Sequence, residues 1–251
     1  MSIIKSFDES EEIIKAEMFT EGQKSLPEIA ICVFKKEIIN YIEQNESFKK
    51  YSTIDVCGDK VEIFVTTVNE IEVAIYRTYI GGPATVAMME ELHARGVNKF
   101  IIYGSCGQLT SNLKKGAFII PTEAYRDEGT SYHYLPVSDF VEIESSKELA
   151  EIFDKEEINY ILTKTWTTDA LFKETKEKMK NRINCGCDVV EMECASIMAV
   201  AISRGFKAYQ FLYTDDALES EKWDMKTLKD DRIFLLKECL NIALKIIKYI
   251  K

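Results

Sequence analysis

The sequence predicts an α/β protein, a three-layer α/β/α sandwich with a central mixed sheet. Apolar strand-like runs alternate with helical patterns along most of the 251 residues, which is the arrangement of a sheet covered by helices. Several of these runs are apolar at consecutive positions, as in strands buried on both faces. No repeat, linker or low-complexity segment divides the chain, so we expect a single domain over residues 1–251.

The first half of the chain predicts four strands and one helix. "IAICVF" (29–34) is a short apolar strand, and 60–80 contains two β-branched runs that form a hairpin around Asn69 and Glu70. "ATVAMMEELHARG" (84–96) has helical periodicity and ends on a glycine. "KFIIYGSCG" (99–107) is a buried strand that runs into a glycine turn.

The second half continues the alternation. Strands are expected at 116–125, 160–166, 187–192 and 208–214, and helices at 145–156, 174–183, 193–205 and 226–250. Ser145 is expected to cap the first of these helices. The last one is amphipathic, because its apolar residues recur at spacings of three and four.

Charge and composition exclude several kinds of partner. The chain has 42 acidic and 32 basic residues, a net charge of −10, and such a surface repels the phosphates of nucleic acids. "MSIIKSFDESEEIIK" has no signal-peptide pattern, and "CLNIALKIIKYIK" is too short and too charged to span a bilayer. We therefore expect a cytoplasmic protein with neither nucleic acid nor membrane as a partner.

Cysteine and histidine usage predicts neither disulfides nor a metal site. The seven cysteines are an odd number and form no CxxC pair, and the chain has only two histidines. Small buried thiols are the expected role of these cysteines.

Three polar clusters follow predicted strands: "GSCG" (104–107), "EMEC" (191–194) and "TDDAL" (214–218). Ligands of α/β proteins gather at the carboxyl ends of strands, so three such ends indicate one site. Taken singly, the first is also compatible with a structural turn and the third with a capped loop. Glu191 and Glu193 stand in an apolar stretch, where an ionised carboxylate needs a hydrogen-bond partner from the chain or from a ligand.

Two long segments carry a resemblance to a known family. "GGPATVAMMEELHARGVNKFIIYGSCGQL" and "DVVEMECASIMAVAISRGFKAYQFLYTDDAL" resemble the nucleoside phosphorylase/nucleosidase superfamily, and the resemblance covers roughly residues 28–218. This superfamily includes hexameric purine nucleoside phosphorylases, uridine phosphorylases and methylthioadenosine/S-adenosylhomocysteine nucleosidases. It implies the family fold, no metal or organic cofactor, and a homo-oligomer assembled from dimers.

The resemblance also implies residue roles. Glu193 binds the ribose hydroxyls, Met192 packs on the ribose, and Glu191 lies near the sugar or base. Asp216 is the catalytic acid that protonates N7 of a purine, with Asp215 as the alternative after a one-residue slip. The positions implied near phosphate and base are Ser105, Cys106 and Gly107, with Phe172 stacking on the base.

Departures from the family pattern concern phosphate. The arginine that precedes the glycine turn in phosphorolytic members is replaced by Ile102, and "VFKKEI" stands where they carry Gly-Asp-Pro-x-Arg. Lys35, Lys36 or Arg126 are hypothetical substitutes. The residues that recognise uracil in uridine phosphorylases also have no counterparts in this sequence, which favours a purine as the base of the substrate.

The implied activity is cleavage of the N-glycosidic bond of a purine-type nucleoside, with inorganic phosphate as acceptor and a free base and pentose 1-phosphate as products. Water as the acceptor, as in the nucleosidases, is the alternative. A nucleoside-binding sensor with little turnover is a third possibility.

Overall fold

The computed structural model describes residues 3–217 and 229–250, which form two compact units. The first unit contains the described residues up to Glu11, together with Ile80–Val86 and the segment from Gly104 to residue 217. The second contains Glu12–Tyr79, Ala87–Tyr103 and residues 229–250. Two elements, α3 (Gly82–Ala94) and β5 (Lys99–Gln108), contribute residues to both units.

The second unit is built on a mixed sheet. Its strands are β1 (Ile29–Val33), β2 (Lys49–Val56), β3 (Asp59–Val68), β4 (Ile71–Arg77) and the first half of β5, and its helices are α1 (Glu17–Thr20), α2 (Lys36–Glu43), most of α3, and α8 (Lys229–Ile246). β1 lies between β4 and β5 and is parallel to both, and all five of its residues are buried. The predicted hairpin is confirmed as β3–β4. Its two turn residues, Asn69 and Glu70, have φ angles of 49° and 68°, as a type I′ turn requires.

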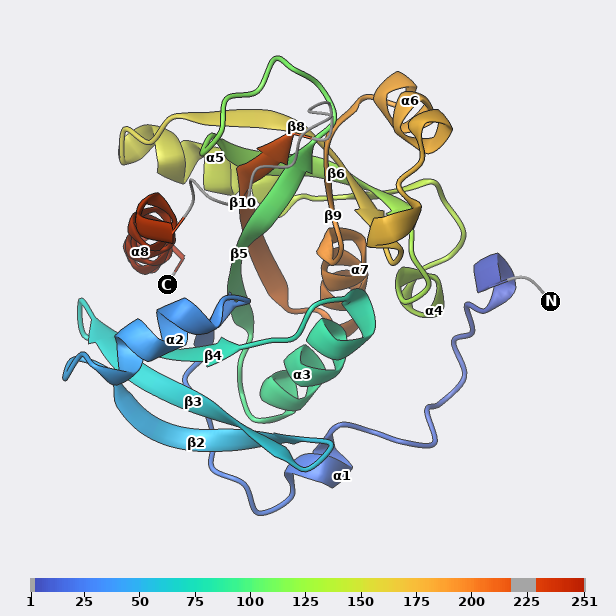
Figure 1. Cartoon of the computed structure of the whole chain (residues 1–251). Helices are drawn as coiled ribbons and strands as arrows, with labels where there is room; N and C mark the ends of the chain where they lie inside the picture. The colour runs from blue at the N-terminus through green and yellow to red at the C-terminus, as the bar shows by residue number, and fades with distance from the viewer. Residues whose placement is uncertain (1–2, 218–228, 251) are drawn as a thin grey trace. The chain divides into compact units, whose positions relative to one another are not determined.

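The first unit contains the remaining strands (Figure 1). They are the end of β5, β6 (Phe118–Asp127), β7 (Phe140–Glu142), β8 (Tyr160–Thr168), β9 (Cys187–Glu191) and β10 (Lys207–Ala217). β8 runs parallel to both β6 and β9, whereas β10 and β7 are antiparallel to β6. The end of β5 pairs antiparallel with β9 through Gly107 and Val190. The predicted α/β class with a mixed sheet is confirmed.

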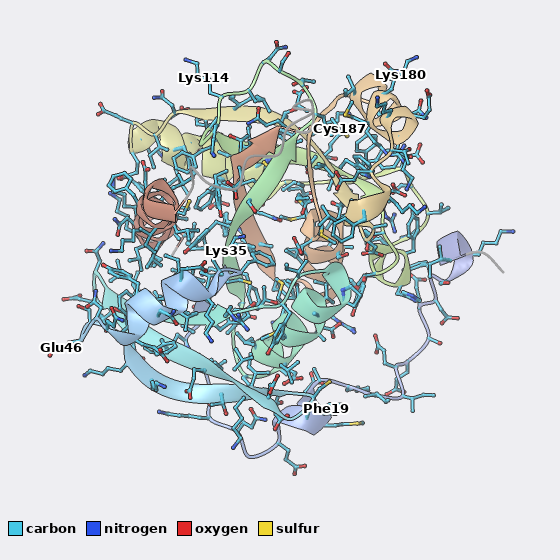
Figure 2. All side chains as sticks on the ribbon, in the orientation of Figure 1. Phe19, Lys35, Glu46, Lys114, Lys180 and Cys187 are labelled. Carbon is cyan, nitrogen blue, oxygen red and sulfur yellow. The ribbon has the colours of Figure 1, made fainter. Side chains whose placement is uncertain are left out.

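The helices of the first unit are η1 (Ile3–Lys5), α4 (Ser131–Tyr134), α5 (Ser145–Lys155), η2 (Leu171–Lys173), α6 (Lys176–Asn184) and α7 (Cys194–Arg204). α5 packs on β6 and β10 through Phe153, whose ring lies 5.5 Å from that of Phe211. Figure 2 shows Lys180 on the outer side of α6, whereas Cys187 at the start of β9 is buried.

Two sequence-based expectations about helices need adjustment. Ser145 begins α5 but does not cap it, because its hydroxyl donates to the carbonyl oxygen of Ala208 at 2.6 Å. The C-terminal helix starts at Lys229 in the structure, and residues 226–228 of the expected helix lie outside the described residues. Within the described part of the chain, no helix has the length and apolarity needed to cross a membrane.

A glycine pair shapes the start of α3. Gly81 has a φ of 101°, a conformation that favours glycine. Gly82 lies directly against α7, because a Cβ atom at this position would stand 2.2 Å from Ser196 Oγ and 2.8 Å from Ser196 Cβ. The two elements approach each other so closely here that only a hydrogen atom fits between them.

We predict that Gly82→Ala destabilises the protein by about 1–3 kcal/mol, since overpacking at a site with no free space has this cost. Urea denaturation measures the change. Gly129→Ala is the control, because a Cβ at Gly129 meets only Asp169 Oδ2, at an ordinary 3.7 Å. Equal unfolding midpoints for the two variants would show that α3 and α7 are farther apart than described.

Candidate active site

The two carboxylates of the Glu-Met-Glu segment occupy the junction between β9 and α7. Glu191 is the last residue of β9 and Glu193 precedes the first residue of α7. Both are buried, with 5% and 8% of their surface exposed. All contacts described below for this junction lie within the first unit.

The Glu191 carboxylate finds its partners inside the chain. Oε1 accepts hydrogen bonds from the hydroxyls of Thr167 at 2.6 Å and Thr165 at 3.4 Å. Oε2 accepts from the backbone N–H groups of Glu193 at 2.8 Å and Cys194 at 2.6 Å. Burial raises the pKa of Glu191, and these hydrogen bonds oppose the rise. Four donors fill the acceptor capacity of a carboxylate, so Glu191 fixes the start of α7 from within.

Glu193 is bound far less completely. Its Oε1 accepts the backbone N–H of Gly81 at 2.7 Å. The backbone of Met192 gives the carboxylate a second hydrogen bond, and no side-chain donor is found for it among the described residues. Burial, and secondarily the charge of Glu191, raise the pKa of Glu193 to about 8. This buried carboxylate is therefore held by backbone N–H groups alone, which leaves acceptor capacity for a ligand.

The glycine segment at 104–107 differs from the expected turn. β5 continues through it as far as Gln108, so Ser105, Cys106 and Gly107 lie in a strand. Cys106 points into a core cluster with Ile119, Val189 and Leu212, and burial raises the pKa of its thiol well above its usual range. Because side chains alternate along a strand, Ser105 points to the opposite face and is partly exposed.

The end of β10 brings a further carboxylate to this region. Asp215 is partly buried, and its charge, like that of Glu191, contributes to the raised pKa of the Cys106 thiol. Asp216 also belongs to β10, but its side chain lies outside the described residues. The assignment of Asp216 as the catalytic acid remains a prediction.

The end of β8 contributes Asp169, which sequence reasoning did not assign to the site. Its Oδ2 accepts the backbone N–H of Gly129 at 2.9 Å, and burial raises its pKa. Its charge also contributes to the raised pKa of Glu193. Phe172, on η2 just beyond, is 97% exposed. Met192 is partly buried between the two glutamates, and the predicted roles of Phe172 and Met192 remain predictions.

Arg126 was one hypothetical phosphate ligand, and the structure shows it engaged elsewhere. Its guanidinium donates to Ser131 Oγ, Pro136 O, Ser138 Oγ and Leu135 O at 2.6–3.2 Å. It also lies 4.0 Å from the ring centroid of Tyr132. A guanidinium committed to four protein oxygens cannot present a two-pronged fork to phosphate without breaking these bonds. Lys35 and Lys36 belong to the second unit.

The threonines that support Glu191 were also missed, although the sequence contains a signal for them. "TKTWTTD" (163–169) places Thr163, Thr165 and Thr167 at every second position, which is one face of a strand. Thr165 and Thr167 bind Glu191, and Thr163 donates to Asp188 Oδ2 at 2.7 Å. A polar stripe on an otherwise buried strand indicates that it faces buried acceptors.

Two further features of the described residues bear on ligands. No three His, Cys, Asp or Glu side chains gather there as a metal ion would require. A cavity of about 630 Å³ is lined by residues near the end of α7, including Met198, Ala201 and Gly205, and by the start of β10. None of the candidate site residues lines this cavity.

The raised pKa of Glu193 predicts a pH-dependent effect of Glu193→Gln. Glu193 keeps its proton in the folded chain up to about pH 8, whereas the unfolded chain loses it near pH 4.5. The stability that this proton provides is complete below pH 4.5 and is lost as the pH rises through 8. The melting temperature of the glutamine variant, relative to the unsubstituted protein, therefore rises between pH 5 and pH 9.

Thermal melts across this range provide the measurement, with Glu46→Gln as a control for the loss of an exposed carboxylate. If the difference in melting temperature between Glu193→Gln and the unsubstituted protein stays constant with pH, Glu193 ionises normally in the folded chain.

Comparison with known proteins identifies the family. The model of the phosphorylase superfamily matches residues 29–248. The guanosine phosphorylase of Halorubrum lacusprofundi is 27% identical over 165 residues, which is 61% of this chain and 68% of that protein. A DeoD-type purine nucleoside phosphorylase of Colwellia psychrerythraea is 26% identical over 180 residues, 69% of this chain and 74% of that protein.

A uridine phosphorylase of Thermococcus kodakarensis is 33% identical over 104 residues, 41% of this chain and 38% of that protein. The chain thus matches less than half of this relative's length, whereas the family model spans most of the chain, including β9, α7 and β10. This protein belongs to the phosphorylase superfamily.

Proposed function

We propose that this protein is a nucleoside phosphorylase that cleaves the N-glycosidic bond of a purine-type nucleoside with phosphate as acceptor. The products are the free base and a pentose 1-phosphate. The observation that carries the proposal is the buried Glu193 carboxylate, which backbone N–H groups hold and which keeps acceptor capacity for a ligand. Relatives named guanosine phosphorylase and purine nucleoside phosphorylase support a purine substrate.

In this proposal Glu193 binds the sugar. Two neighbouring hydroxyls of a ribose donate hydrogen bonds to an ionised carboxylate, which is a strong, charge-assisted arrangement. Because the pKa of Glu193 is about 8 without ligand, binding of the sugar favours the ionised form and releases a proton near neutral pH. Met192 packs on the ribose, while Glu191 keeps the backbone of Glu193 in place.

Asp216 acts on the base. It donates a proton to N7 of the purine as the glycosidic bond breaks, so that the base does not leave as an anion. The sugar passes through an oxocarbenium-like state, which the negative charge of Glu193 stabilises. Phe172 stacks on the base, and Ser105 and Gly107, with the backbone of Cys106, lie near the base and the acceptor.

Hydrolysis is the second candidate, and two observations favour it. Ile102, which replaces a family arginine, is completely buried in β5. Arg126 is committed to protein oxygens. With these groups unable to hold phosphate, water would take its place as the acceptor.

We also infer that the protein is a cytoplasmic homo-oligomer built from dimers, with a role in purine salvage. Leu171 and Phe172, two adjacent exposed apolar side chains on η2, support a subunit contact, because adjoining exposed apolar groups commonly mark a contact surface.

The acceptor is tested by following base release from guanosine, inosine and adenosine with and without inorganic phosphate. Strict dependence on phosphate, with pentose 1-phosphate as a product, is the expected result. Equal rates in phosphate-free buffer, with free pentose as the product, would replace phosphorolysis by hydrolysis.

Substitution of the two aspartates separates their roles. We expect Asp216→Asn to lower kcat by about 10²-fold or more, because a general acid contributes on the order of 10²–10⁴-fold, with nucleoside binding retained. Asp215→Asn is the matched control and should lower kcat by less than about tenfold. The reverse ranking would transfer the catalytic role to Asp215, and full activity of both variants would exclude either as the acid.

A further inference from the structure

We propose that Glu128 is a positioning residue for the sugar-binding carboxylate Glu193, because it fixes the start of α7 against the start of α3. This inference rests on the proposed function. Glu128 follows β6 and is buried, with 6% of its surface exposed. Neither its place in the sequence nor the proposed chemistry assigns it a role.

The Glu128 carboxylate is filled by donors from the chain. Oε2 accepts from Ser196 Oγ at 2.5 Å and from the backbone N–H of Ser131 at 3.0 Å. Oε1 accepts from the Ser131 hydroxyl, whose oxygen in turn accepts Arg126 Nε–H at 2.8 Å. With both oxygens engaged by the chain, Glu128 acts through the groups that it holds.

Ser196 connects Glu128 to the sugar site. It lies on α7, three residues after Glu193, and therefore about one turn along the helix. Its hydroxyl and Cβ occupy the space beside Gly82 where any side chain would clash. Gly81, next to Gly82, donates the hydrogen bond that holds Glu193 Oε1. The packing of Ser196 on Gly82 and the hydrogen bond from Gly81 to Glu193 thus join the same two elements.

The hydroxyl of Ser196 has little room, so its direction matters. Glu128 gives it an acceptor on the side of the 128–131 turn. Without that acceptor the buried hydroxyl has to find another partner by rotating. Rotation beside Gly82 changes the contact that sets the distance between α3 and α7, and hence the position of Gly81 N–H relative to Glu193.

Other contacts of the turn from Glu128 to Ser131 support the same inference. Thr130 Oγ1 lies 3.2 Å from the position of a Cβ at Gly82. Gly129 N–H donates to Asp169, at the end of β8. The turn from Glu128 to Ser131 therefore contacts α3, α7 and the end of β8, three elements whose ends surround Glu193. A carboxylate suits the centre of this turn because it accepts several hydrogen bonds at once.

A displaced Glu193 has a specific consequence for substrate choice. Glu193 recognises sugar hydroxyls, so its displacement weakens the recognition of ribose more than that of 2′-deoxyribose. Protonation of the base by Asp216 is common to both sugars. The ratio of kcat/KM for a ribonucleoside to kcat/KM for its 2′-deoxy analogue therefore reports the position of Glu193, whereas a general loss of folded protein lowers both values equally.

The test compares this ratio for guanosine and 2′-deoxyguanosine in the unsubstituted protein and in Glu128→Gln, Glu128→Ala and Ser196→Ala. Glu193→Gln gives the lowest ratio to be expected, because it removes the sugar-binding carboxylate itself. We expect Glu128→Ala to lower the ratio by about tenfold, the size of one lost hydrogen bond to a charged group. Glu128→Gln keeps one acceptor oxygen, so its ratio should lie between that of the unsubstituted protein and that of Glu128→Ala. Ser196→Ala should also lower the ratio.

Glu148→Gln is the matched control, because Glu148 on α5 accepts hydrogen bonds from Tyr209 and Lys207 instead of from the 128–131 turn. Its ratio should equal that of the unsubstituted protein. If Glu128→Gln and Ser196→Ala are folded and keep the original ratio, Glu128 is merely structural and the inference is wrong. If the unsubstituted protein neither binds nor cleaves any nucleoside, the proposed function fails, and this inference fails with it.

Discussion

The buried carboxylate of Glu191 is the interaction on which the geometry of the candidate site depends. Two threonine hydroxyls from β8 and two backbone N–H groups at the start of α7 meet on its two oxygens. It thus joins one strand, the end of the next strand and the first turn of a helix. The N-terminus of a helix favours negative charge, which offsets part of the cost of burying this group. Removing it would leave several buried donors without an acceptor, the most expensive kind of loss in a protein interior.

The different roles of Glu191 and Glu193 follow from this arrangement. Glu191 is satisfied by the chain, so its position does not depend on a ligand. Glu193 is held by backbone N–H groups alone, and burial and the charge of Glu191 make its ionisation harder. The free protein therefore carries an unfavourable buried group that hydroxyl donors of a ligand would stabilise. Functional sites commonly retain such locally unfavourable groups, at a cost that the surrounding structure offsets.

Most strongly apolar elements could be predicted from the sequence. β1, the β3–β4 hairpin, β5, α5 and α7 were found because their apolar residues follow a strand or helix period. β2 was missed because Ile54 is its only fully buried residue. α2 was missed because it is short and buries only Ile38 and Ile42. Edge strands and short helices owe their structure to neighbours in space, which a local pattern does not contain.

The site was predictable in part. Glu193 stood out as a carboxylate in an apolar stretch, but the internal role of Glu191 did not. The sequence left open whether the chain or a ligand binds the two carboxylates, and the family resemblance placed Glu191 near the sugar or base. The strand ends at Glu191, and Glu193 has a φ of −139° and a ψ of −27° at the entry to α7. That change of direction separates the two side chains, and it arises from the tertiary contacts of Glu191.

The segment Ile80–Val86 belongs to the first unit, although residues of the second unit flank it on both sides. Through this segment Gly81 reaches Glu193 across 112 positions of the sequence. During translation Gly81 is therefore synthesised long before Glu193, its hydrogen-bond partner. The contact at the proposed sugar site therefore forms only after both segments have been synthesised, and loop closure over such a separation slows folding. No continuous piece of the chain that stops short of Glu193, or starts after Gly81, contains both halves of it.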